Sequence, residues 1–140
     1  MGNAGAVYSE KVVDHALNPR NVGVIQYPDG YGRATIPCGD TLQICLRVKD
    51  NIITDAKFVT NGCGPTIACG SITSELIKGK SISEALEITE EDITGNLDGL
   101  PESEGHCACL AASALQQAIR DYLLLKREPW KKNFRIFEPL

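Results

Sequence analysis

The stretch TLQICLRVKDNIITDAKFVT, residues 41–60, constrains the fold of this chain more than any other. Its first nine residues alternate apolar and polar side chains, which is the pattern of a strand with one apolar face. Asp50 and Asn51 predict a tight turn into a second β-rich run at 52–60. A shorter extended segment at 32–36 precedes them. Together the three segments predict a three-stranded antiparallel meander.

Helical spacing of apolar residues dominates much of the remaining sequence. A first helix is expected to begin after a Ser9 cap and to end before Pro19, because the residue before a proline avoids the helical region. A second helix should begin with Pro65 and stop at Gly79. The strongest helix is predicted at 105–127, and we expect it to pack along the sheet. Short helical pieces are predicted around 83–86 and 89–93.

The composition fits one compact domain. With 140 residues and 43% hydrophobic content, we place that domain over 1–140, with a flexible start at 1–7 and a tail at 129–140. A net charge of −4 argues against nucleic acid and anionic membranes as partners. No run approaches the roughly 18 apolar residues of a membrane span, and the start lacks an export signal, so we expect a cytoplasmic protein.

Six cysteines without an export signal suggest metal binding or catalysis rather than a disulfide framework. Three of them lie at the ends of predicted elements, where separate segments can converge. Cys38 is in a turn, Cys63 directly precedes a helix, and Cys107 is at the start of the long helix. Because a helix N-terminus favours the thiolate, we expect Cys63 and Cys107 to favour this metal-binding form.

Asp40 and His106 add an oxygen and a nitrogen donor beside these sulfurs. Three thiolates with one such ligand suit zinc, or an iron–sulfur cluster held through cysteine and one other residue. A carboxylate matches a ferric–sulfide centre poorly, so a cluster with Asp40 as a ligand should be held less firmly than one with four thiolates. Such a site would suit a cluster that is handed on.

The other cysteines are interpreted as small core residues and not as ligands. On a helix with about 100° per residue, Cys109 points about 200° away from Cys107, so the two cannot readily clamp one ion. Cys69 lies well inside its helix, and Cys45 lies within a strand. His15, on the first helix, is interpreted as a surface or half-buried residue.

The sequence resembles the IscU/NifU family of iron–sulfur cluster assembly scaffolds over nearly its whole length. Segments 8–12 (YSEKV) and 18–23 (NPRNVG) resemble the family's opening. Segments 38–40 (CGD), 61–64 (NGCG) and 106–107 (HC) resemble its three ligand motifs, in order and at comparable spacing. The resemblance implies an α+β fold, with a three-stranded antiparallel sheet packed against helices on one side and a long C-terminal helix.

The resemblance also implies a function. A cysteine desulfurase delivers sulfur to such a scaffold, iron joins it, and a transient [2Fe-2S] cluster forms and passes to acceptor apoproteins such as ferredoxin. By this resemblance Cys38, Cys63 and Cys107 are the cluster ligands and sulfur-accepting thiols, and Asp40 and His106 are auxiliary ligands. The chain would be a carrier and not an enzyme, and its cluster-free form could bind Zn²⁺.

Two features of the sequence bear on its partners. Many bacterial family members carry Leu-Pro-Pro-Val-Lys before the His-Cys pair, a motif expected to dock an Hsp70-type chaperone. This chain has LPESE at 100–104, with an acid in place of the lysine, so that partner is the one the resemblance supports least. Tyr8 resembles an aromatic residue that can take part in dimer contacts, which favours a homodimer; the alternative is that Tyr8 packs on the body of the protein.

Two other functions are consistent with the same residues. The first is a zinc protein without iron chemistry, since cysteine, aspartate and histidine also satisfy tetrahedral zinc. The second is a thiol enzyme with a Cys107–His106 pair. Adjacent residues on a helix diverge by about 100°, which makes the hydrogen bond between nucleophile and base awkward. Failure to assemble a cluster would favour the zinc protein, and turnover of a thioester or peptide without metal would favour the enzyme.

Overall fold

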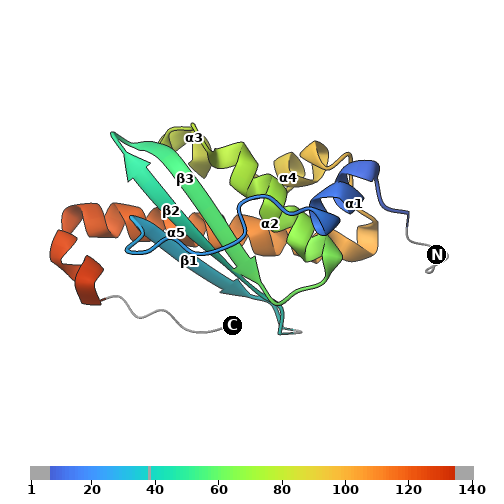
Figure 1. The fold of residues 1–140 in the computed structure, drawn as a ribbon, viewed down its shortest axis with the longest axis horizontal. Coiled ribbons are helices and arrows are strands. Elements are labelled where there is room, and N and C mark those ends of the chain that lie inside the picture. The colour runs from blue at the N-terminus through green and yellow to red at the C-terminus, as the bar shows by residue number, and fades with distance from the viewer. Residues whose placement is uncertain (1–6, 38, 135–140) are drawn as a thin grey trace.

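The protein, described by a computed structural model over residues 7–37 and 39–134, is built around one antiparallel sheet. The strands β1 (Gly30–Thr35), β2 (Thr41–Lys49) and β3 (Ile52–Thr60) lie in that order (Figure 1). The predicted meander is confirmed, although β1 begins two residues earlier than the expected segment at 32–36. Asp50 and Asn51 both have positive φ, 54° and 61°, as a type I′ turn between two strands requires.

Helices account for most of the remaining described residues. They are α1 (Glu10–Leu17), α2 (Gly64–Ile77), α3 (Ile82–Leu86), α4 (Glu90–Asn96) and α5 (Gly105–Arg127), with short 3₁₀ turns η1 (Glu102–Glu104) and η2 (Pro129–Phe134). The Ser9 cap is confirmed, because its hydroxyl accepts a hydrogen bond from the Val12 N–H. The long helix also has its predicted bounds. Within the described residues, no helix has both the length and the apolar character that a membrane span needs.

The long helix α5 lies directly on β1, and small residues make this close approach possible. A Cβ on Gly32 would overlap the carbonyl oxygen of Ala114 and would lie 2.9 Å from the Cα of Ala118. On Gly30 the same atom would lie 3.2 Å from the Cβ of Tyr122. Helix backbone therefore rests on strand backbone, which fixes where the N-terminal end of α5 sits relative to the sheet.

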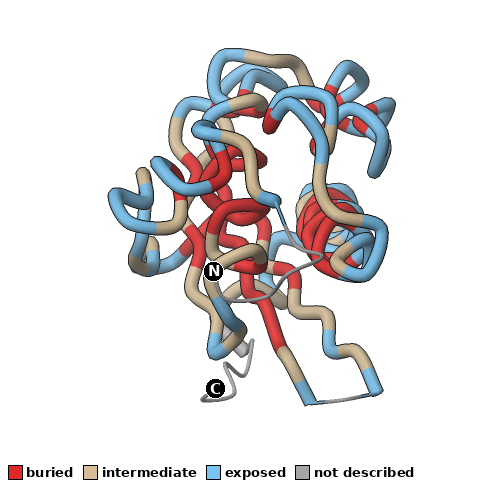
Figure 2. The backbone as a smooth tube through the Cα atoms, turned by 90° about the vertical axis from the view of Figure 1, so that its right-hand side faces the viewer, coloured by how far each residue is buried: buried red, intermediate tan, exposed pale blue. Residues whose placement is uncertain are grey.

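The helices form a layer over one face of the sheet, and the buried part of the backbone lies where the helices and the sheet meet (Figures 1 and 2). Leu42, Ile44 and Leu46 of β2 are at most 1% exposed, which agrees with the apolar face predicted by the alternation. Gln43 and Cys45 alternate with them and are also buried. The central strand is therefore shielded on both faces.

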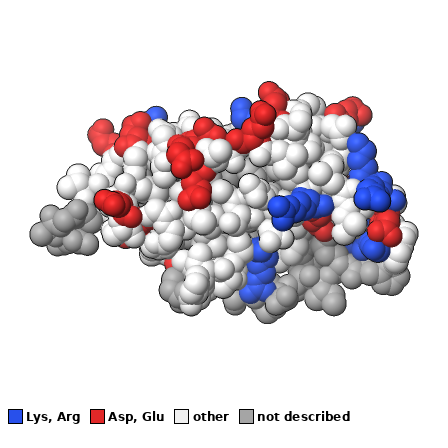
Figure 3. Space-filling model, turned by 180° about the vertical axis from the view of Figure 1, so that it is seen from behind, with Lys and Arg blue, Asp and Glu red and all other residues white. Residues whose placement is uncertain are grey.

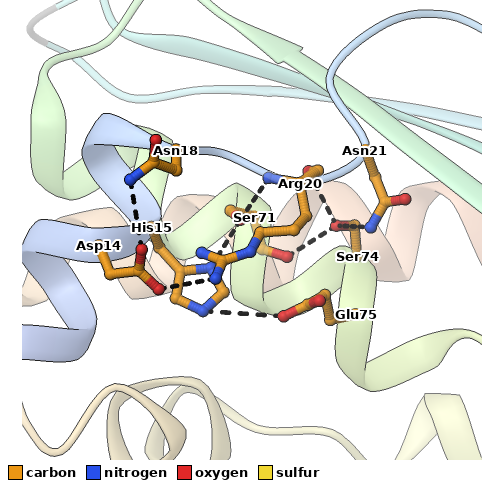
Figure 4. A network of polar contacts seen from close by, with 8 residues as sticks. All are labelled: Asp14, His15, Asn18, Arg20, Asn21, Ser71, Ser74 and Glu75. Carbon is orange, nitrogen blue, oxygen red and sulfur yellow. Dashed lines mark hydrogen bonds and ion pairs between the residues drawn. The ribbon is translucent and has the colours of Figure 1, made fainter.

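A buried polar network attaches α1 to α2 (Figure 4). His15 is 6% exposed, which corrects its interpretation as a surface or half-buried residue. Its Nδ1 lies 2.7 Å from Ser71 Oγ, and its Nε2 lies 3.7 Å from a carboxylate oxygen of Glu75. The backbone N–H of Arg20 also donates to Ser71 Oγ. Burial, aided by the Arg20 charge, lowers the pKa of His15, which favours the neutral imidazole.

Charged residues follow the dipoles of the helices that carry them. Acidic side chains Glu90, Glu91 and Asp92 lie in the first turn of α4, and Lys126 and Arg127 lie in the last turn of α5. In the space-filling view, acidic groups gather along one rim and basic groups toward one end (Figure 3). The acids in the first turn of α4 and the bases in the last turn of α5 stabilise these helix ends, since a helix N-terminus carries partial positive charge and a C-terminus partial negative charge.

Candidate metal centre

Hydrogen bonds at the start of β2 and the end of β3 fix the loop that leads into α2. The Thr41 N–H donates to Asn61 Oδ1 at 2.8 Å, and the Thr60 hydroxyl donates to the Thr41 carbonyl at 2.6 Å. The Gly62 N–H then donates to Thr60 Oγ1 at 3.0 Å. Cys63 follows directly before α2, with extended backbone angles and an exposed side chain. The sheet thus fixes the backbone that presents the Cys63 thiol.

The start of α5 supplies a second sulfur, and the preceding turn supplies an oxygen. Cys107 is fully buried, and Glu104, the last residue of η1, is partly buried. Cys63 Sγ, Cys107 Sγ and a Glu104 carboxylate oxygen all lie within 4.8 Å of one another. Three side chains of the kinds that bind metals therefore converge from two separate segments, and two of them are cysteines for which this convergence was predicted.

Thr66 lies between the two sulfurs. Its hydroxyl donates to Cys107 Sγ at 3.3 Å, and its Oγ1 is 3.8 Å from Cys63 Sγ. The side chain is fully buried, and a Cβ added to Gly62 would come within 2.7 Å of the Thr66 Cβ. The glycine before Cys63 therefore leaves the space that Thr66 occupies.

Burial controls the protonation of Cys107. Desolvation raises the pKa of its thiol to about 12, although the Thr66 hydrogen bond acts in the opposite direction. The charges of Cys63 and Glu104 also raise this pKa. The prediction that Cys107 would favour the thiolate is therefore wrong, because its burial at the start of the helix, the largest cause of the shift, favours the protonated thiol. A metal ion that binds this sulfur must displace its proton.

Comparison with known proteins places this chain in a family. Residues 7–128 match the family described as the NifU-like N-terminal domain. This chain belongs to that family. A relative from Archaeoglobus fulgidus, named iron-sulfur cluster assembly scaffold protein IscU 1, is 51% identical over 117 residues, which cover 83% of this chain and 76% of the relative.

Further NifU-like relatives agree with this assignment. The iron-sulfur cluster assembly scaffold protein IscU of Escherichia coli K12 is 47% identical over 120 residues, which cover 82% of this chain and 93% of that protein. A solved structure of a nitrogen-fixing NifU-like protein from Brucella abortus (N-terminal part) has a TM-score of 0.69 at 16% identity, over 82% of this chain and 93% of the other. At that identity the structure supports the α+β fold alone.

The predicted ligands of this NifU-like domain are only partly brought together by the described residues. Cys63 and Cys107 meet, and Cys38 lies outside the described residues. Asp40 is partly buried in the loop between β1 and β2, and His106 is exposed on α5. Neither belongs to the three-donor group, which consists of Cys63, Glu104 and Cys107 and was found among the described residues. Their auxiliary roles stay predictions.

Sequence reasoning missed two members of the site, Glu104 and Thr66. Glu104 precedes Cys107 by three residues, and Thr66 follows Cys63 by three residues. Side chains three residues apart share one face of a helical turn, so this spacing was a usable signal. It was ambiguous, because an acid before a helix and a threonine in its first turn are both common for structural reasons.

Three cysteines among the described residues lie outside the group of Cys63, Glu104 and Cys107, namely Cys45, Cys69 and Cys109. Cys45 and Cys69 are buried, which agrees with their interpretation as core residues. Burial, with the charges of Cys107 and Cys63, raises the pKa of the Cys69 thiol well above its usual range. Cys109 is exposed, so its interpretation as a core residue is wrong, although its direction away from buried Cys107 was expected.

Proposed function

We propose that this protein is a scaffold on which iron and sulfur are assembled into a [2Fe-2S] cluster, which then passes to acceptor apoproteins. The observation that supports this most strongly is the convergence of Cys63 and Cys107 from two separate segments. The names of relatives that are 47% and 51% identical point in the same direction. The cluster is cargo, so the chain would work as a carrier with no turnover of its own.

In this proposal Cys38, Cys63 and Cys107 hold the cluster, with Asp40 or His106 as a further ligand. A cysteine desulfurase supplies the sulfur, and the exposed thiol of Cys63 is accessible to such a partner. Acceptors such as ferredoxin receive the finished cluster. We place this work in the cytoplasm, and a homodimer could share one cluster between two copies.

Anaerobic incubation with ferrous iron, cysteine, a cysteine desulfurase and a thiol reductant tests cluster assembly. The reductant supplies the electrons that, with those of ferrous iron, convert the sulfane sulfur from the desulfurase into the sulfide of the cluster. The wild type should gain visible sulfide-to-iron absorption, with equal amounts of iron and acid-labile sulfide. A Cys63→Ala variant should lose or weaken this absorption. Cys109→Ala is the matched control, because Cys109 is also exposed but lies outside the three-donor group. A colourless wild type, or a Cys63→Ala variant that assembles as well as the control, would contradict the proposal.

A zinc-binding module is the second candidate function. Two cysteine sulfurs and a carboxylate oxygen within 4.8 Å of one another are also zinc ligands. Zinc binding alone does not separate the two functions, because a cluster-free scaffold could bind zinc. Tight retention of one zinc together with failure to assemble a cluster from iron and sulfide would fit only this second candidate.

A further inference from the structure

We propose that Glu104 is a metal ligand, and that Cys63, Cys107 and Glu104 form a site for one divalent metal ion. The inference deepens the proposed function, on which it rests for the identity of the ion as incoming iron, or as zinc in the cluster-free protein. Sequence reasoning assigned no role to this carboxylate. The resemblance pointed instead to Asp40 and His106 as the residues that complete the sulfur site.

The spacing of the donor atoms fits one tetrahedral ion. Zn–S and Zn–O bonds of about 2.3 and 2.1 Å at tetrahedral angles put a sulfur and an oxygen ligand roughly 3.6 Å apart. The Cys107 Sγ and Glu104 Oε2 atoms are already 3.7 Å apart. The same bond lengths put two sulfur ligands about 3.8 Å apart. Because Cys63 Sγ lies within 4.8 Å of both other donors, a shift of about 1 Å completes the arrangement.

The carboxylate of Glu104 does not have the structural role expected of an acid in front of a helix, which is to cap that helix. Glu104 directly precedes α5, yet its side chain makes no capping hydrogen bond to that helix. Oε2 instead accepts the Cys107 thiol, at the long distance typical of sulfur. A helix-capping explanation therefore does not account for the orientation of this side chain.

Tyr8 holds the other carboxylate oxygen. Its hydroxyl donates to Glu104 Oε1 at 3.4 Å, which leaves Oε2 directed at the sulfur. Tyr8 packs against the core. Its position in the sequence was consistent either with a dimer contact or with this packing on the body of the protein. Metal-binding carboxylates are commonly oriented in this way by an outer hydrogen bond. Tyr8 is thus a positioning residue for the proposed ligand.

Titration with Co²⁺ alone, without sulfide, tests the inference separately from cluster assembly. The wild type should show thiolate-to-cobalt charge transfer and the visible bands of a tetrahedral ion. Glu104→Gln should alter the visible bands and weaken Co²⁺ binding by more than about 10-fold, since losing even an outer hydrogen-bond partner of a ligand typically costs about 10- to 100-fold. Glu102→Gln is the matched control, because Glu102 is an exposed acid on the same turn and outside the three-donor group. The control should bind like the wild type.

Two further variants keep the test decisive if Glu104→Gln unfolds, which circular dichroism reports. Tyr8→Phe leaves every proposed ligand in place and should still weaken Co²⁺ binding, by less than the loss of Glu104. Cys109→Ala should leave Co²⁺ affinity unchanged, because Cys109 is exposed and lies outside the group of Cys63, Glu104 and Cys107. The inference is overturned if a folded Glu104→Gln variant binds as the control does, or, should that variant unfold, if Tyr8→Phe binds Co²⁺ like the wild type. A wild type that binds Co²⁺ as expected but never assembles a cluster would instead overturn only the proposed function.

Discussion

At the scale of single residues, the hydroxyl of Thr66 matters because it contacts both sulfurs of the site. A Thr66→Val variant keeps the shape of this buried side chain and removes its donor to Cys107. Hydrogen bonds to sulfur tune a metal–thiolate centre, so we expect a chelator to remove the assembled cluster about tenfold faster. The loss of visible absorption with time measures this rate. An unchanged rate would show that the Thr66 hydroxyl has no part in holding the cluster.

Thr73 provides a matched substitution on the same helix. Its Oγ1 is buried and makes no hydrogen bond within residues 7–37 and 39–134. Thr73→Val removes a polar group that lacks a partner, so the free energy of unfolding should rise by about 1 kcal/mol while cluster loss stays at the wild-type rate. Urea unfolding measures the first effect. Destabilisation by this variant would mean that the Thr73 hydroxyl has a partner after all.

The site itself could be predicted only in part from single residues. Cys63 and Cys107 were recognisable because they lie at element ends, which the backbone pattern locates. Glu104 was not recognised, because its role depends on how the turn before α5 orients its carboxylate toward a sulfur. The raised pKa of Cys107 likewise depends on burial, and no local sequence pattern reports how deeply the first turn of a helix will be packed.

At the scale of elements, the packing of α5 on β1 depends on Gly32. A Gly32→Ala variant would place a Cβ against the backbone of α5, which cannot move without shifting the start of the helix. We expect a loss of about 3 kcal/mol in the free energy of unfolding. Gly95→Ala in α4 is the control, because a Cβ there meets no atom within 4 Å, and it should stabilise by about 0.5–1 kcal/mol. Equal effects of the two substitutions on the urea midpoint would contradict this packing.

The attachment of α1 to α2 should depend on pH through His15. Its pKa in the folded protein is below the usual 6.5, so the unfolded chain binds a proton more readily as the pH falls. Stability is therefore fully present above pH 6.5 and declines below it, by up to about 1.4 kcal/mol per pH unit, until the folded pKa is passed. Lys11 and Arg20 oppose protonation, whereas Asp14 and Glu75 favour it without reversing the direction.

Urea midpoints at pH 7.5, 6.5 and 5.5 check this dependence on His15. His15→Gln should flatten the decline over this range. His106→Ala should preserve it, because the only other histidine is exposed. If His106→Ala flattened the curve and His15→Gln did not, the buried network would not be its source.

Elements were the most predictable level of this structure. The alternation in β2, the turn at Asp50 and Asn51, the Ser9 cap and the bounds of α5 are all local signals, and all are confirmed. The start of β1 was missed by two residues because Gly30 carries no side chain that would continue an alternating pattern. His15 was misjudged because its burial depends on α2, a segment more than fifty residues away.

At the scale of the whole molecule, metal binding should stabilise the fold, since the proposed ligands join the loop before α2 to the start of α5. At a free Zn²⁺ concentration 100 times the Kd, the free energy of unfolding should rise by about 2.7 kcal/mol. Thermal unfolding with and without Zn²⁺, followed by a chelator, measures this shift. The Cys63→Ala variant should show little of it, and an equal shift in that variant would place the ion elsewhere.

The central claim is that a cluster is built on this chain and then leaves it. The most direct measurement is one anaerobic time course in which the chain first receives desulfurase-derived sulfur, a thiol reductant and ferrous iron, and is then mixed with excess apo-ferredoxin. Its spectra resolve cluster on the chain from cluster on ferredoxin. We predict that absorption on the chain falls as that of ferredoxin rises, with iron and sulfide conserved. A cluster that stays on the chain, or that never forms there, would contradict the account.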